Sequence, residues 1–347
     1  MSESWFELSF ADQNEILEVA AGQSGRPAHL LEKDIWVVWT LAAIYNSPLG
    51  NCLTFKGGTS LSKVYKVIDR FSEDIDLTYD IRELVPDLLR NGNPIPASAS
   101  QEKKITSAVR CRLPQWIEQT VKPVIEQALV ASNLQAELSL SGKNSDQLII
   151  VYPANKSGTG YAAATIRLEF GARATGEPHH KHHVACDIAP LIESVEFPSA
   201  KPLVMAAERT FWEKATAAHV YCLQGRLRGE RYSRHWYDLA ALAGTPHFNA
   251  AVNNRELARQ VAAHKSMFFT EKDVAGSKVD YFQATDGCLR LIPDDPSLAA
   301  LEKDYAAMLE DGLLTLDQPA FSAVMEVCRT IEDRINRLTS LGEHSNR

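Results

Sequence analysis

Two neighbouring stretches decide how this chain folds: Phe-Lys-Gly-Gly-Thr-Ser-Leu-Ser-Lys at 55–63 and Arg-Phe-Ser-Glu-Asp-Ile-Asp-Leu-Thr-Tyr at 70–79. A short apolar run at 52–55 ends abruptly before the two glycines, and Thr59 can cap a helix that continues to about residue 67. Within the second stretch, residues 74–79 alternate polar and apolar side chains, which is the period of a half-buried strand. The order strand, Gly-Gly turn, helix, strand therefore predicts a mixed fold here.

Periodicity along the rest of the chain predicts a mixed part followed by a helical part. Apolar residues at helical spacing predict helices at 26–45 and about 101–131. Four strand-like runs are spaced like an antiparallel meander: 135–140, 147–152, 163–170 and 183–188. The helices predicted beyond residue 201 are 203–223, 233–243, 253–268, 298–309 and 320–338. We therefore expect an α+β fold, with a mixed-sheet domain at 1–200, an all-helical domain at 201–347 and the boundary near 198–202.

The composition indicates an ordinary globular protein. The chain has 347 residues, 45% of them hydrophobic and 23% charged, which is enough for a sizeable core and two domains. We expect a cytoplasmic protein, because no secretory signal is evident and no run approaches the ~18 apolar residues of a transmembrane helix. The six scattered cysteines suit reduced thiols better than disulfides or a zinc site. The net charge of −8 means that any nucleic-acid contact needs a local basic patch.

A pair of acidic side chains is the first candidate for chemistry. Asp74 and Asp76 stand two residues apart on the predicted strand, so both point to the same face. Two such carboxylates repel each other unless a cation lies between them, and Mg²⁺ is normally held by one or two carboxylates plus substrate phosphates. An Asp-x-Asp pattern alone is weak evidence, because most are exposed strand faces. Its specificity comes from the Gly-Gly turn before it.

That turn offers a second kind of site. Gly57 and Gly58 let backbone N–H groups approach phosphate oxygens, and the start of the following helix adds partial positive charge. Thr59 or Ser60 can add a hydroxyl group. The alternative is a turn that needs glycine only for tight packing.

The order of these motifs resembles the DNA polymerase beta-like nucleotidyltransferase fold, and within it the AbiEii/MenT-type toxins of bacterial toxin–antitoxin systems. The resemblance rests on the two opening stretches and extends to four shorter ones: Glu-Lys-Asp at 32–34, Thr-Ile-Arg-Leu-Glu-Phe at 165–170, Arg-Thr-Phe-Trp-Glu-Lys at 209–214 and Tyr-Asp-Leu at 237–239. It covers roughly the first two-thirds of the chain. The helices after about residue 249 carry no motif that matches.

The resemblance implies a metal-dependent enzyme that transfers a nucleoside monophosphate from a nucleoside triphosphate (NTP) to an acceptor. It implies Mg²⁺ or Mn²⁺ as cofactor, the 3′ end of a tRNA as acceptor, and a cognate antitoxin, often a winged-helix DNA-binding protein, as partner. It also implies a toxin or phage-defence role, with the helical domain contributing to the active-site cleft. Transfer to a protein or a small molecule, and a silent nucleotide-binding module, stay open as alternatives.

The resemblance also assigns roles to single residues. Asp74, Asp76 and Glu169 would hold the metal, and Ser72 would act beside them in catalysis. The nucleotide would be bound by Gly57, Gly58, Thr59, Ser60, Lys63 and Lys214. Glu169 has an alternative as the polar face of an edge strand, and Ser72 has one as a turn or capping residue.

Lys214 and Asp238 complete the predicted catalytic set. Lys214 lies on an apolar helix, where a lysine must either extend to solvent or meet a phosphate. A lysine that reaches the triphosphate would neutralise charge that develops during transfer. Asp238 would orient Lys214 or the base, or else form a buried salt bridge with an arginine.

Two further segments have both functional and ordinary interpretations. Residues 224–234 hold four arginines and a tyrosine, which suits an RNA or triphosphate contact or simply a solvated loop. The histidines at 179–183 suggest metal binding, but no cysteine or carboxylate stands at zinc spacing, so a loop or the start of a strand is favoured.

Overall fold

The computed structural model describes residues 3–72, 74–156, 163–225, 227, 231–310, 313–314 and 317–344. Contacts between residues divide the chain into two units of three stretches each. The sheet unit comprises Met1–Val64, Phe71–Pro94 and Lys103–Met205, and the helical unit comprises Tyr65–Arg70, Ile95–Glu102 and Ala206–Arg347. Two short stretches from the N-terminal half of the chain therefore belong to the helical unit.

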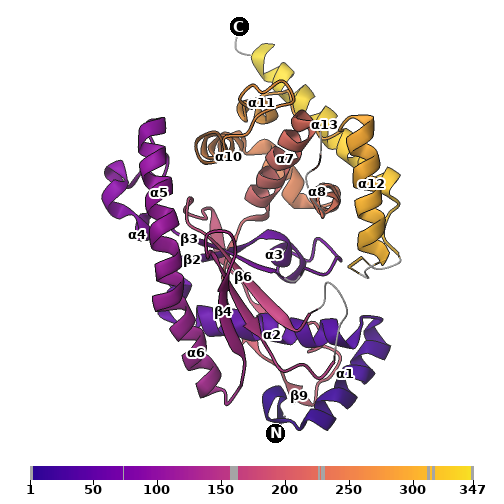
Figure 1. Ribbon diagram of the computed structural model, residues 1–347. Helices are drawn as coiled ribbons and strands as arrows, with labels where there is room; N and C mark the ends of the chain where they lie inside the picture. The colour runs from indigo at the N-terminus through magenta and orange to yellow at the C-terminus, as the bar shows by residue number, and fades with distance from the viewer. Residues whose placement is uncertain are drawn as a thin grey trace. The chain divides into compact units, whose positions relative to one another are not determined.

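A mixed seven-stranded sheet is the centre of the sheet unit (Figure 1). Its strands are β2 (Leu53–Lys56), β3 (Asp74–Tyr79), β4 (Glu137–Ser141), β5 (Gln147–Val151), β6 (Thr165–Gly171), β7 (His179–Lys181) and β11 (Leu203–Met205). They lie in the order β4-β5-β6-β3-β2-β11-β7. β3 is parallel to β6 and β11 to β2, and the other neighbours are antiparallel. This sheet confirms the predicted α+β class.

The predicted meander is correct for its first three strands and wrong for the fourth. β4, β5 and β6 pair in sequence order, as expected. Of residues 183–188, only Val184–Ala185 (β8) is a strand, and it pairs with Ser199–Ala200 (β10) outside the main sheet. A turn ends this strand, since the N–H of Ala189 donates to the carbonyl of Cys186 just before Pro190. The neighbour of β6 is instead β3, far away along the chain.

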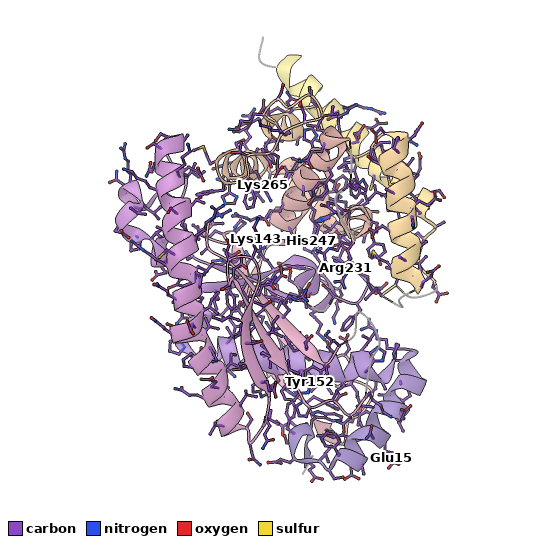
Figure 2. All side chains as sticks on the ribbon, in the orientation of Figure 1. Glu15, Lys143, Tyr152, Arg231, His247 and Lys265 are labelled. Atoms are coloured by element: carbon purple, nitrogen blue, oxygen red, sulfur yellow. The ribbon has the colours of Figure 1, made fainter. Side chains whose placement is uncertain are left out.

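The apolar helix predicted at 26–45 is central to the sheet unit. It forms α2 (Ala28–Tyr45), which packs against α1 (Phe10–Ser24), β6 and α6. The Trp36 ring of α2 stacks on Tyr152, labelled in Figure 2, with 5.0 Å between the ring centroids. Two short helices of the sheet unit are α3 (Gly57–Lys63) and α4 (Ile81–Leu84).

The long helix predicted at 101–131 is one rod in Figure 1. It consists of α5 (Ala99–Trp116), a wider π-helical turn at Ile117–Val121 and α6 (Lys122–Ala131). The wider turn precedes Pro123, whose nitrogen has no hydrogen to donate to the preceding turn.

Three consecutive charged side chains of α2, Glu32, Lys33 and Asp34, are buried. A buried charge is costly unless a partner satisfies it, and here each one holds a different distant segment. Their partners, in the same order, are the N–H of Asn155 (2.7 Å), the carbonyl of Ala163 (3.1 Å) and the N–H of Asp187 (2.7 Å). These bonds explain why a charged triplet interrupts an apolar helix.

The regular structure described beyond residue 206 of the helical unit is mainly helical. Its helices are α7 (Ala207–Gln224), α8 (Ser233–Ala243), α9 (Pro246–Asn253), α10 (Arg255–Phe268), α11 (Phe282–Thr285), α12 (Asp295–Glu310) and α13 (Phe321–His344). α7 packs against α8, α9 and α10, and α8 packs against α12 and α13. The fully buried Trp236 of α8 anchors this core, because its indole N–H donates to the carbonyl of Leu291 at 2.6 Å.

One predicted helix starts too early, and one helix was not predicted. The helix predicted at 203–223 begins only at Ala207, because the preceding residues form β11 between β2 and β7. Helical periodicity does not reveal a strand that is defined by long-range pairing. The separate helix α9 was not predicted, although Thr245 followed by Pro246 is a typical helix start. No described helix is long and apolar enough to cross a membrane.

Candidate active site

The register between β3 and β6 gathers the predicted acidic residues on one face of the sheet. Asp76 lies opposite Glu169, and Asp74 lies opposite Arg167. Side chains at paired positions of neighbouring strands point to the same face, and Ile75 and Leu77 are fully buried on the other. The pairing of β3 with β6 therefore places Glu169 on the same face as Asp74 and Asp76, although Glu169 lies more than 90 residues further along the chain.

The three carboxylates differ in their partners. Asp74 lies 3.5 Å from the Arg167 guanidinium, and Glu169 accepts a hydrogen bond of 2.8 Å from the Gln147 side chain. Among the described residues, the carboxylate of Asp76 has neither a hydrogen-bond nor an ion-pair partner. A partly buried carboxylate without a partner is a natural cation ligand.

Whether this acidic face fits a divalent ion depends on how many of its side chains can bind one. Within the described ranges, no group of three or more His, Cys, Asp or Glu side chains is arranged to hold a metal ion. The pair Asp74 and Asp76 matches the small number of carboxylates that Mg²⁺ takes when substrate phosphates complete its shell. Glu169 as a third ligand stays a prediction. Glu73, next to Asp74, lies outside the described residues.

Gly57 lies directly against the acid pair. Its φ is +82°, a conformation that side chains other than glycine's rarely adopt. A Cβ atom here would stand 2.0 Å from Oδ2 of Asp76. The turn therefore needs glycine for both its backbone angle and its approach to the carboxylate, which favours the packing interpretation without testing phosphate binding.

The hydroxyl groups of the turn already have partners within the protein. Thr59 is buried, and its Oγ1 donates to the carbonyl of Asp74 and lies 3.0 Å from Oγ of Ser72. The equally buried Ser60 donates to the carbonyl of Gly57 at 2.9 Å. The bonds of Thr59 tie α3 to the start of β3. The predicted contacts of Gly57, Gly58, Thr59 and Ser60 with a nucleotide stay predictions, and so does the catalytic role of Ser72.

Lys63 is the cation of a buried ion-pair network. Its Nζ lies 2.6 Å from Asp34 and 2.8 Å from Asp187, and Asp187 also pairs with Arg26 at 2.5 Å. Burial lowers the pKa of Lys63, but the two carboxylates outweigh burial, so its pKa lies above the ordinary value. The sequence analysis missed Asp187, because no local pattern links it to a residue 124 positions away. Nucleotide binding by Lys63 stays a prediction.

The helical unit contains a second cluster, around Asp238. This carboxylate is fully buried and lies 2.8 Å from Nζ of Lys214. It also forms two hydrogen bonds with the guanidinium of Arg70, at 2.7 and 2.8 Å. Both interpretations of Asp238 thus describe real contacts: it is paired with an arginine and it holds Lys214. The sequence analysis missed Arg70, although it lies in one of the two quoted stretches.

The surroundings shift the pKa values of this cluster. Burial raises the pKa of Asp238, but Arg70 and Lys214 outweigh burial and hold that pKa far below its ordinary value. Burial lowers the pKa of Lys214, and the positive charges of Arg70 and Arg234 lower it further, against the opposing effect of Asp238. The catalytic roles of Lys214 and Asp238 stay predictions.

The histidine segment at 179–183 and the basic loop at 224–234 form contacts within the protein. His179 begins β7, and its Nδ1 lies 3.1 Å from the Thr54 hydroxyl, which agrees with the predicted strand start. In the basic loop, Arg226 and residues 228–230 lie outside the described residues. The N–H groups of Arg231 (labelled in Figure 2) and Ser233 donate to Asp304, at 2.6 and 2.8 Å. Contact of this loop with RNA stays a prediction.

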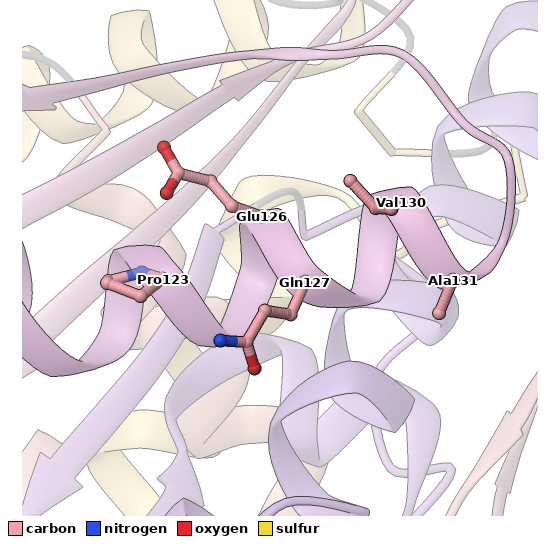
Figure 3. A pocket seen from close by; sticks show the side chains of 5 residues that line it. All are labelled: Pro123, Glu126, Gln127, Val130 and Ala131. Atoms are coloured by element: carbon pink, nitrogen blue, oxygen red, sulfur yellow. The ribbon is translucent and has the colours of Figure 1, made fainter.

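The hollow on α6 is not a candidate active site. It has a volume of about 360 Å³ (Figure 3) and is lined by Pro123, Glu126, Gln127, Val130 and Ala131. Glu126 is the single ionisable group in this lining, so the hollow offers no acid pair.

Comparisons with known proteins identify the family. The model of a family described as nucleotidyl transferase AbiEii toxin, type IV toxin–antitoxin system, matches residues 39–327, well beyond the end of the recognised motifs. Among solved structures, MenT4, a nucleotidyltransferase toxin from Mycobacterium tuberculosis H37Rv, is similar at 16% identity and a TM-score of 0.45, over 96% of this chain and 99% of that one. No curated protein matches. The chain belongs to the AbiEii family and is a nucleotidyltransferase toxin of a type IV toxin–antitoxin system.

Proposed function

We propose that this toxin transfers a nucleoside monophosphate from an NTP to the 3′ end of a tRNA, using Mg²⁺ held by Asp74 and Asp76. The observation that carries the proposal is the acidic face of β3. There two carboxylates point the same way, Glu169 shares their face on the neighbouring strand, and Gly57 packs directly against the carboxylate of Asp76. Family membership supplies the reaction class. The acceptor and the metal rest on the resemblance and on this geometry.

The reaction joins the acceptor hydroxyl oxygen to the α-phosphorus of the NTP. The bond from that phosphorus to its bridging oxygen breaks, and pyrophosphate leaves. When bound, Mg²⁺ or Mn²⁺ would lower the pKa of the hydroxyl and neutralise charge on the leaving group. Glu169, oriented by Gln147, is placed in this proposal to take the hydroxyl proton.

The residues of the helical unit have proposed roles in the same reaction. Lys214 supplies positive charge to the phosphates, where negative charge develops during transfer. Asp238 orients Lys214, which its 2.8 Å ion pair supports. A cognate antitoxin is the proposed protein partner.

The choice of tRNA follows from the family resemblance, and the net charge limits how the RNA is held. With a net charge of −8, the protein needs a small basic surface for a polyanionic acceptor. The arginines of residues 224–234 are the proposed contact. A protein or a small molecule as acceptor would not need them.

The test is transfer of label from each α-labelled NTP to total tRNA in the presence of Mg²⁺. Asp74→Ala removes one proposed ligand, and Asp87→Ala is the control, because Asp87 forms an exposed ion pair with Arg112 and its side chain has no other partner among the described residues. We expect label in tRNA with the wild type and the control, and none with Asp74→Ala or after chelation of the metal.

The other outcomes separate the alternatives. Label on protein or on a small molecule would keep the reaction and change the acceptor. Nucleotide binding without transfer to any acceptor would contradict the proposal and favour a silent module.

A further inference from the structure

We infer that Arg70 is a positioning residue of this nucleotidyltransferase: its guanidinium fixes the Asp238 carboxylate, and that carboxylate in turn fixes the Lys214 ammonium. The inference rests on the proposed role of Lys214 at the phosphates. It assigns to Arg70 an indirect role, because Arg70 would act through two other side chains.

The geometry of the three side chains supports this order. Nε and Nη2 of Arg70 donate to Oδ1 and Oδ2 of Asp238 at 2.7 and 2.8 Å, which sets the plane of the carboxylate. Oδ2 of Asp238 also lies 2.8 Å from Nζ of Lys214. A lysine ammonium is a point charge on a flexible stem, so it cannot fix a carboxylate plane by itself. The rigid member of the cluster is therefore Arg70.

Arg70 is itself anchored to the helix that carries Asp238. The N–H of the preceding residue, Asp69, donates to the hydroxyl of Tyr237 at 3.4 Å, and Tyr237 adjoins Asp238 on α8. The Tyr237 hydroxyl donates to Gln318 at 2.6 Å, which holds it in turn. The Arg70 side chain is only 5% exposed. Such preorganisation suits a residue that must define a geometry.

Two neighbours of Asp238 on α8 complete its surroundings. Arg234 adds positive charge near Lys214. Burial and then the positive charges of Lys214 and Arg234 hold the pKa of His235 far below its ordinary value.

The experiment compares Arg70→Met and Arg70→Lys with the wild type, using Arg255→Met as the control. Arg255, on α10 of the same unit, forms a longer and more exposed ion pair with Asp286 at 3.6 Å, so its loss removes an arginine ion pair away from Asp238. We expect Arg70→Met to lower kcat about 10- to 100-fold, with a smaller change in KM for the NTP. Arg70→Lys, which keeps the charge but not the two-pronged geometry, should recover part of kcat.

The pH profile separates positioning from a loss of folded protein. Activity needs protonated Lys214 and is lost as pH rises through its pKa. The charge of Arg70 lowers that pKa, so removing it should move the alkaline limb of kcat to higher pH. A destabilised fold would lower the amplitude and leave the limb in place.

Two results would overturn the inference. One is an Arg70→Met protein with the wild-type kcat and alkaline limb. The other, decisive if Arg70→Met does not fold, is an Arg70→Lys protein with full kcat. Failure of the proposed function is a different result, because the wild type itself would then transfer no label. Loss of activity in Arg255→Met equal to that in Arg70→Met would also contradict the inference.

Discussion

Replacing Gly57 by alanine should separate the activity of this enzyme from its stability. The new Cβ atom would stand 2.0 Å from Oδ2 of Asp76, whereas real Cβ contacts are not closer than 3.0 Å. The carboxylate must therefore move by about 1 Å, and misplacement of a reacting group by this distance can cost about 100-fold in rate. We predict a loss of nucleotidyl transfer of that size.

The expected loss of stability is much smaller. The φ of +82° costs alanine about 1–2 kcal/mol, which corresponds to roughly 2–8 °C in the melting temperature of a domain of this size. The Asp76 side chain can rotate away from the new methyl group, so the clash adds little to this cost. The assay is the initial rate of label transfer to the acceptor at saturating NTP and Mg²⁺, with thermal unfolding of the same samples.

Gly25→Ala is the matched control. Gly25 also has a positive φ, +70°, but nothing lies within 4 Å of an added Cβ atom. It shares the backbone penalty without the contact to Asp76, so it should lose similar stability and keep its activity. Wild-type rates for Gly57→Ala, or equal losses of activity in both variants, would refute the role assigned to the contact.

Three further substitutions test other parts of the structure. Asp76→Asn should abolish transfer without lowering the melting temperature, because it removes a carboxylate that has no partner among the described residues; retained Mg²⁺-dependent transfer would contradict this. Lys63→Met leaves Asp34 and Asp187 facing each other and should cost about 3–5 kcal/mol in urea unfolding, and unchanged stability would contradict the role of this ion pair. KM for the NTP, measured on the same protein, tests the predicted contact of Lys63 with the nucleotide, which would raise KM when it is lost. Asp238→Asn should lower the melting temperature at pH 7 and weaken its decrease at acid pH. The pKa of Asp238 is depressed in the folded protein, so its carboxylate contributes stability above the unfolded pKa of about 3.8, and this stability is lost as pH falls through the folded pKa. An unchanged decrease of the melting temperature at acid pH would count against the pairing of Asp238 with its two cations.

The sequence alone determined the elements whose pattern is local. Alternation over six residues predicted β3 with its bounds, and helical spacing predicted α8 with its bounds and the rod from α5 to α6. It also placed Asp74 and Asp76 on one face, because the period of a strand fixes which side chains share a side. These predictions depend only on residues that are neighbours along the chain.

Tertiary packing decided which distant residues meet. Glu169 reaches Asp76 only because β6 pairs with β3 in one register, and a shift by one residue would turn it to the other face. β11 was mistaken for the start of a helix, since its partners β2 and β7 are set by the sheet and not by its own period.

The buried ion pairs show most clearly what the sequence pattern predicts and what only the tertiary structure decides. The charged residues Lys63 and Arg70 were visible in the quoted stretches, but their partners Asp187 and Asp238 lie 124 and 168 residues away. Nothing in a local pattern selects one carboxylate among the 44 acidic residues of the chain. Burial in the folded core decides which carboxylate pairs with each cation, because a charge removed from water needs a partner inside the protein.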